Sequence, residues 1–160
     1  MSENFLEIKA VSKVFRTGSI LSRRKLAAVD QVTLALEKDR PQILSIVGES
    51  GSGKTTLARM VLRLMQPTSG EIILDGMSTG GRLSTHQLRE FRRKVQPIFQ
   101  NPFESFSSRK TVDTYLFETA RNVLGARTKA TAHQAVDEAL HNVGLSAERV
   151  IGRYPNQFSG

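Results

Sequence analysis

Eight consecutive residues have the types and spacing of a phosphate-binding loop. The segment Gly48-Glu49-Ser50-Gly51-Ser52-Gly53-Lys54-Thr55 fits the pattern G-x-x-x-x-G-K-[ST]. Glycines let the backbone curl so that successive amide N–H groups point toward one anion. Lys54 adds a positive charge for the β- and γ-phosphates, Thr55 offers a hydroxyl to Mg²⁺, and Thr56 adds a contact near the α-phosphate. These residues predict a site for a nucleoside triphosphate with magnesium.

Such a loop works only between a strand and a helix, and the flanking residues predict both. The run Ile43–Val47 is short, apolar and rich in β-branched residues, as expected of a strand buried on both faces. After the loop, apolar residues recur with helical spacing at Leu57, Val61, Leu64 and Met65. The sequence therefore predicts a strand that enters the loop and an amphipathic helix that leaves it.

The first hundred residues contain mostly strand patterns. Residues 5–11 and 29–36 predict an antiparallel pair, joined by a basic surface loop over 16–25. A strand over Glu71–Leu74 turns at Asp75-Gly76, a loop covers Met77–Leu83, a helix begins near Ser84, and a short strand follows over Val95–Phe99.

The remaining residues are predicted to be helical. Thr111 is placed to cap a helix whose apolar stripe is Val112, Leu116, Ala120 and Val123. A second helix begins near Lys129, with the stripe Ala132, Val136, Leu140 and Val143, and Gly144 stands where a left-handed residue ends a helix.

Composition narrows the classes of protein. The 160 residues fit one domain or part of a larger one, and the absence of cysteine excludes disulfides, thiolate metal sites and thiol nucleophiles. We expect no secretory signal and no membrane span, because no apolar run approaches about 20 residues. The net charge of +8 includes two tight basic groups, Arg23–Lys25 and Arg92–Lys94. They are either solvated surface or contacts for a partner, lipid or nucleic acid.

The order of these features resembles the ATP-binding subunit of ABC transporters over essentially the whole chain. The resemblance rests on the phosphate-binding loop, the segment Pro67–Gly76, Gln100 and the final Tyr154–Gly160. It implies an α/β P-loop NTPase fold, an ABC-type nucleotide-binding domain that is incomplete. An antiparallel β-subdomain with the P-loop core would occupy about residues 1–100. A helical subdomain over about 101–160 would end inside the signature motif.

The resemblance also implies roles for individual residues. Gln100 would reach the metal and the attacking water, and Phe15 would stack on adenine, although Gln100 is otherwise a polar strand end and Phe15 otherwise core. Ser159 and Gly160 would contact the γ-phosphate held by an opposite subunit. The implied ATP contacts from the loop are Gly48, Glu49, Ser50, Gly51, Ser52, Gly53, Lys54, Thr55 and Thr56, with Mg²⁺ held by Thr55 and Gln100.

The implied function is to couple ATP binding and hydrolysis to solute import from the cytoplasmic side of a membrane, as a peripheral subunit. Partners would be a second ATP-binding subunit, identical or different, transmembrane permease subunits and, indirectly, a solute-binding protein. Ile98–Pro102 and Arg109–Val112 look most like the oligopeptide, dipeptide and nickel importer branch. Ser105–Arg109 departs from that branch, which leaves the substrate class open, and is either a partner surface or a plain interdomain loop.

The family's Walker B aspartate, its adjoining glutamate and the switch histidine would all follow residue 160. We therefore expect this chain to bind ATP and hydrolyse it poorly. Two alternatives stay open: a fragment that only binds or regulates, and a soluble ABC-type ATPase acting on DNA or ribosomes. The second is disfavoured because no coiled coil, zinc module or second cassette follows Gln100.

Overall fold

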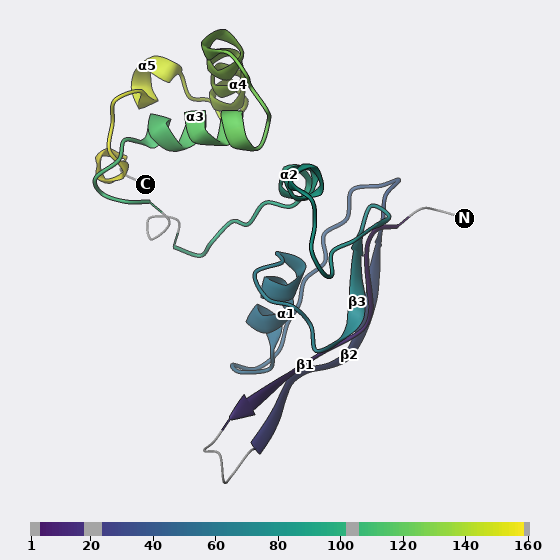
Figure 1. The fold of residues 1–160 in the computed structure, drawn as a ribbon. Helices are drawn as coiled ribbons and strands as arrows, with labels where there is room; N and C mark the ends of the chain where they lie inside the picture. The colour runs from purple at the N-terminus through teal and green to yellow at the C-terminus, as the bar shows by residue number, and fades with distance from the viewer. Residues whose placement is uncertain (1–3, 18–23, 102–105, 159–160) are drawn as a thin grey trace. The chain divides into compact units, whose positions relative to one another are not determined.

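The computed structural model describes residues 4–17, 24–101 and 106–158. The chain forms two compact units, residues 1–84 and 85–160. The first unit contains all the described strands and the phosphate-binding loop, and the second contains the remaining helices (Figure 1). The functional division predicted near residue 100 stays a prediction.

The first unit is built on a four-stranded antiparallel sheet. Its strands are β1 (Asn4–Thr17), β2 (Arg24–Glu37), β3 (Ser69–Leu74) and β4 (Met77–Ser78), in the spatial order β2-β1-β3-β4. The predicted antiparallel pair is confirmed, and it is longer than predicted. Thr17 pairs with Arg24, so the predicted loop over 16–25 was too long.

One helix packs beside this sheet. Helix α1 (Lys54–Val61) buries Leu57 and Met60 and lies next to β2 (Figure 1). The predicted stripe extended to Leu64 and Met65, which was wrong, because the helix ends at Val61. Arg63 has a left-handed φ of 58°, and its guanidinium donates to the carbonyl oxygens of Thr79 and Gly81 at 2.8 and 2.5 Å. These bonds hold the chain out of the helix.

Two predicted strands are absent. Residues 43–47 and 95–99 form no strand, and Ile43 and Ile98 are each 98% exposed. An apolar run becomes a buried strand only when neighbouring strands satisfy its N–H and C=O groups. Among the described residues neither run has such a neighbour, so the prediction of two buried strands was wrong for this chain. Also, the predicted loop over Met77–Leu83 begins with the short strand β4.

The second unit contains the predicted helices and two short ones. They are α2 (Thr85–Lys94), α3 (Val112–Asn122), α4 (Lys129–Asn142), α5 (Ala147–Val150) and the 3₁₀ helix η2 (Pro155–Gln157). The starts predicted near Ser84, Thr111 and Lys129 are confirmed. Gly144 has the predicted left-handed φ, at 73°. Among the described helices, none has the length and apolar content needed to cross a bilayer.

The core of the second unit lies between α3, α4 and α5. Its buried members are Ala120, Ala132, Val136, Leu140 and Val150, so the stripes predicted for α3 and α4 do face a common core. Val143, which was predicted to continue the α4 stripe, is exposed because the helix has ended one residue earlier.

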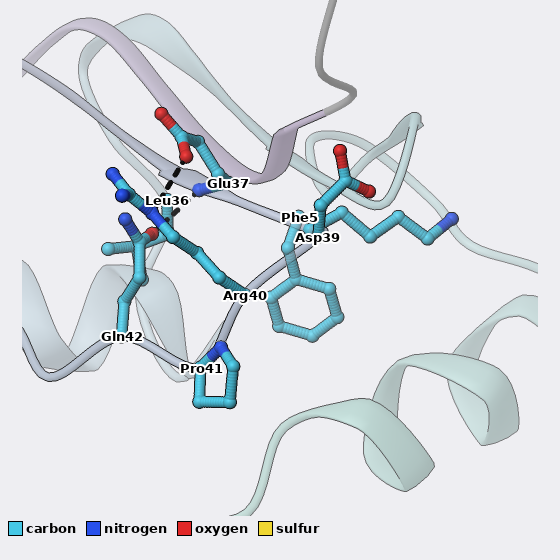
Figure 2. Close-up of a pocket in the computed structure, with 8 residues that line it drawn as sticks. Phe5, Leu36, Glu37, Asp39, Arg40, Pro41 and Gln42 are labelled. Atoms are coloured by element: carbon cyan, nitrogen blue, oxygen red, sulfur yellow. Dashed lines mark hydrogen bonds and ion pairs between the residues drawn. The ribbon is translucent and has the colours of Figure 1, made fainter.

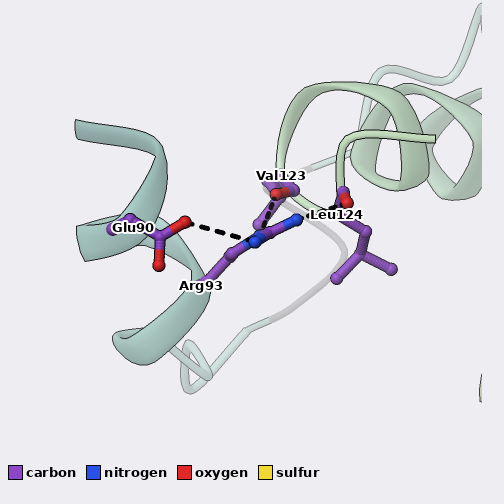
Figure 3. Close-up of polar contacts among 4 residues, drawn as sticks. All are labelled: Glu90, Arg93, Val123 and Leu124. Atoms are coloured by element: carbon purple, nitrogen blue, oxygen red, sulfur yellow. Dashed lines mark hydrogen bonds and ion pairs between the residues drawn. The ribbon is translucent and has the colours of Figure 1, made fainter. Parts of the chain in front are cut away.

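Helix α2 is joined to the end of α3 by one arginine. The Arg93 guanidinium donates to the carbonyl oxygen of Val123 at 2.7 Å and to that of Leu124 at 2.5 Å, and it also pairs with Glu90 at 3.2 Å (Figure 3). The last carbonyls of a helix have no acceptor role inside it. Arg93 therefore caps α3 from a different helix.

Candidate nucleotide-binding site

The phosphate-binding loop closes around the ammonium group of its own lysine. Lys54 Nζ donates to the carbonyl oxygens of Gly48 at 2.7 Å and Glu49 at 2.6 Å, and to Ser52 Oγ at 3.3 Å. The Ser52 amide donates to Glu49 O at 3.2 Å, which closes the turn. The loop is curled, and a positive charge lies within reach of its concave side.

Gly53 is required by the backbone and by the packing of the loop on β2. Its φ of 91° is left-handed, and a Cβ built there would lie 2.0 Å from the carbonyl oxygen of Ala28. No side chain fits in that space. Gly53 therefore serves two purposes: it turns the chain into α1, and it lets the loop lie directly against β2.

Helix α1 begins at Lys54, immediately after the loop. Its first N–H groups have no acceptor within the helix, and the aligned peptide dipoles make this end positive. Thr55 is exposed and Thr56 is half-buried, both in the first turn. The loop and the helix end together provide amide donors, an ammonium group and hydroxyls on one side, which is the donor set that a polyphosphate needs.

A cavity of about 530 Å³ lies between this loop and β2. One wall comes from β2, including Ala28, Asp30 and Val32, and the other comes from Ile46–Gly48 and Ser52–Lys54. Its size is within the usual range for small-molecule sites. The sequence patterns did not single out the β2 wall. Only the pairing of β2 with β1 shows that these residues face the loop.

Magnesium fits this site with few protein ligands. Among the described residues there is no group of three or more His, Cys, Asp or Glu side chains that could hold a metal. Mg²⁺ bound with a nucleotide is held mainly by phosphate oxygens and water. The exposed Thr55 hydroxyl would be the ligand that the loop supplies.

The structure does not bring the other predicted site residues to this loop. Phe15 is half-buried on β1, opposite Leu26, with Lys13 Nζ 5.6 Å from its ring centroid. It is not among the described residues that line the cavity. Gln100 is exposed in a bend of the second unit. Ser159 and Gly160 lie outside the described residues. The roles of these four residues stay predictions.

A second cavity, of about 440 Å³, lies at the other end of β2. Phe5, Leu36 and Pro41 give it apolar walls, and Glu37 and Arg40 form an ion pair of 2.9 Å at its edge (Figure 2). The Glu37 amide donates to Gln42 Oε1 at 2.8 Å. Glu37 and Arg40 bind each other, so this cavity lacks the concentration of unpaired donors found at the loop.

Comparison with known proteins gives one consistent family. The family described as ABC transporter matches residues 29–160. The chain is 40% identical over 160 residues to the oligopeptide transport ATP-binding protein OppF of Bacillus subtilis (strain 168), covering 100% of this chain and 50% of that protein. It is 39% identical over 155 residues to a putative peptide import ATP-binding protein of Brucella ovis, covering 97% of this chain and 46% of that protein. The chain thus spans about half the length of the curated relatives it matches.

Solved structures agree on the fold. A dimeric bacterial ABC transporter cassette, MJ0796, matches with a TM-score of 0.75 and 26% identity over 97% of this chain and 63% of that chain. CbiO1 of Clostridium perfringens, part of an ABC transporter complex, matches with a TM-score of 0.69 over 98% of this chain and 56% of that chain. The identity of 20% in the second case supports the fold alone.

Proposed function

Because the chain belongs to the ABC transporter family and has the incomplete α/β cassette fold, we propose that it binds MgATP through residues 48–55 as part of the ATP-binding subunit of an importer. The closed loop around Lys54 is the observation that carries this proposal. Relatives with peptide import names favour a peptide as the transported solute.

The proposed partners follow from the same membership. A second ATP-binding subunit would complete the nucleotide sites, and permease subunits would carry the solute across the membrane, with a solute-binding protein acting indirectly. One matched structure is described as a dimer, which supports the first of these. The subunit would lie peripherally on the cytoplasmic side.

The residues of the loop divide the work of binding. The Lys54 ammonium, now held by two carbonyl oxygens and Ser52 Oγ, can exchange these acceptors for phosphate oxygens that carry more negative charge. The amides at the start of α1 donate to the same oxygens, and Gly53 keeps them in place. Bound magnesium would neutralise phosphate charge and polarise the terminal phosphoryl group. Thr55 would hold it.

We propose further that this chain binds ATP and does not hydrolyse it steadily. Phosphoryl transfer depends on a residue that orients the attacking water and on a carboxylate that supports the metal. Gln100 is the residue of this chain assigned to the water and the metal. No Asp-Glu pair follows an apolar strand pattern in the 160 residues, and we assign none of the three histidines to catalysis.

Titration calorimetry with MgATP tests the binding proposal. Lys54→Ala should lose measurable binding, because a charge-assisted bond contributes about 1.5–3 kcal/mol and each 1.4 kcal/mol changes affinity about tenfold. Lys129→Ala is the matched control, since Lys129 begins α4 as Lys54 begins α1. Gln100→Ala should bind nearly as the parent does. Unchanged affinity in Lys54→Ala would exclude the loop as the phosphate site.

Phosphate release at saturating MgATP tests the hydrolysis proposal. The rate for residues 1–160 should equal that of the Lys54→Ala variant, since the proposed chain lacks the carboxylate that activates water. A rate clearly above that of the variant would show that another group in this chain activates water.

A further inference from the structure

Tyr115, in the first turn of α3, holds the turn that precedes this helix. Its hydroxyl oxygen accepts a hydrogen bond from the Ser107 amide at 2.7 Å. The Phe106 ring meets the Tyr115 ring edge-on, with centroids 5.0 Å apart and planes at 88°. Lys110 Nζ lies 5.6 Å from the centroid of the same ring. One side chain therefore contacts three residues of the preceding segment.

The segment Ser107–Lys110 is also bonded internally. The Lys110 amide donates to Ser107 O at 3.2 Å, and the Arg109 amide donates to Ser107 Oγ at 3.3 Å. Lys110 pairs with Glu118 of α3 at 3.1 Å, so its charge has a partner. The segment is a defined turn fixed to α3 at both of its ends.

Arg109 is the charge that this turn leaves available. Its side chain is exposed, and within the described part of the chain it has no hydrogen-bond or ion-pair partner. A guanidinium can bind a carboxylate through two parallel hydrogen bonds. Holding such a group on a rigid turn lowers the entropy lost when it binds a partner.

We propose that Ser107–Lys110 is a preformed docking turn, that Arg109 receives a carboxylate of a partner chain, and that Tyr115 is the residue that positions the turn. The partner is a membrane subunit, and this assignment alone rests on the proposed function. The turn departs from the residues usual in the importer branch it resembles, and its positioning ring belongs to this chain's own sequence.

Amide hydrogen exchange tests the positioning role. Tyr115→Phe keeps the ring and removes only the oxygen that accepts from Ser107. Exchange at the Ser107 amide should rise about tenfold, as expected when a bond of about 1 kcal/mol is lost, while amides of α3 and of the loop at Gly48–Thr55 stay unchanged. Tyr154→Phe changes the other tyrosine and should leave Ser107 as it was. Unchanged exchange in Tyr115→Phe would overturn the positioning role.

Nuclear magnetic resonance with a capped hexaglutamate peptide tests the docking role. The peptide should shift the Arg109 Nε–Hε signal in a saturable way, and capped hexaglutamine should not. Arg109→Gln should abolish saturable binding, and Tyr115→Phe should weaken it. Arg127→Gln, at another exposed arginine of the second unit, should bind as the parent does. Equal weakening by Arg109→Gln and Arg127→Gln would show nonspecific charge attraction and overturn the proposal.

The same samples separate this proposal from the proposed function. MgATP binding without peptide binding would reject the docking turn and leave the nucleotide site intact. Peptide binding at Arg109 without MgATP binding would reject the nucleotide site and leave a carboxylate-binding turn whose partner is not a transporter subunit.

Discussion

Gly53 shows how one residue can be fixed by two requirements of different origin. The loop pattern calls for glycine there because the backbone must curl around an anion. The structure adds a second reason, since the Ala28 carbonyl oxygen occupies the place of a side chain. The first requirement can be seen in the sequence and the second cannot, because Ala28 is 25 residues away along the chain.

Three glycine-to-alanine variants separate these requirements. Gly80→Ala should change stability by less than about 0.5 kcal/mol, because its φ is ordinary and the nearest atom to the new Cβ is 3.8 Å away. Gly51→Ala should lose about 1–2 kcal/mol, the strain of a left-handed φ of 81° in open space. Gly53→Ala should lose clearly more, since it adds a contact of 2.0 Å to the same strain. Urea unfolding measures all three, and equal losses at Gly51 and Gly53 would contradict the role of Ala28.

At the level of elements, Arg93 makes the end of α3 depend on α2. The two carbonyl oxygens it binds belong to the residues just after α3, and they would otherwise bind only water. Gly125 follows them with a left-handed φ of 77°, and a Cβ built there would lie 3.4 Å from the guanidinium. The glycine thus leaves room for the arginine as well as ending the helix.

Arg93→Ala should therefore destabilise the chain more than Arg92→Ala. Loss of two hydrogen bonds from a charged donor is expected to lower the free energy of unfolding by about 1–2 kcal/mol, discounted for the partial exposure of Arg93. The neighbouring Arg92 side chain is exposed and should change it by less than about 0.5 kcal/mol. Urea unfolding checks the difference, and amide exchange at Gly125 locates it. Equal values for the two variants would mean that the contact contributes nothing to stability.

Local signals predicted the helices well and the central strands poorly. Thr111, Lys129 and Gly144 mark helix ends through bonds to residues three or four positions away, which a sequence displays directly. A strand has no such bonds within itself. Residues 43–47 have the composition of a strand, but that composition does not supply the neighbours that make one.

The same distinction holds for the candidate site. The contacts of Lys54 lie within a short segment and follow from the loop pattern. The wall contributed by β2 depends on packing across the sheet, and Gln100 belongs to a separate unit. Sequence reasoning therefore predicted the cradle for the phosphates and could not identify the residues that face it.

At the scale of the whole molecule, the notable feature is apolar surface beside the site. In the first unit, Ile43 and Val47 are 98% and 88% exposed, in an extended segment that joins no strand among the described residues. Unpaired β-branched segments attract other strands, and exposed apolar patches favour association. Because this segment leads directly into the phosphate-binding loop, association there would also restrict the loop.

Residues 1–160 in isolation should accordingly self-associate with rising concentration, and Ile43→Lys should reduce this. The substitution places a charge in the extended segment, where it opposes pairing with a second strand. Leu64→Lys is the control, because Leu64 is 67% exposed but lies in a turn whose amide donates to Arg59 O. Sedimentation velocity over a range of concentrations should show a smaller weight-average mass for Ile43→Lys than for Leu64→Lys. Equal masses would indicate that association is driven by general hydrophobicity and does not involve the segment before the loop.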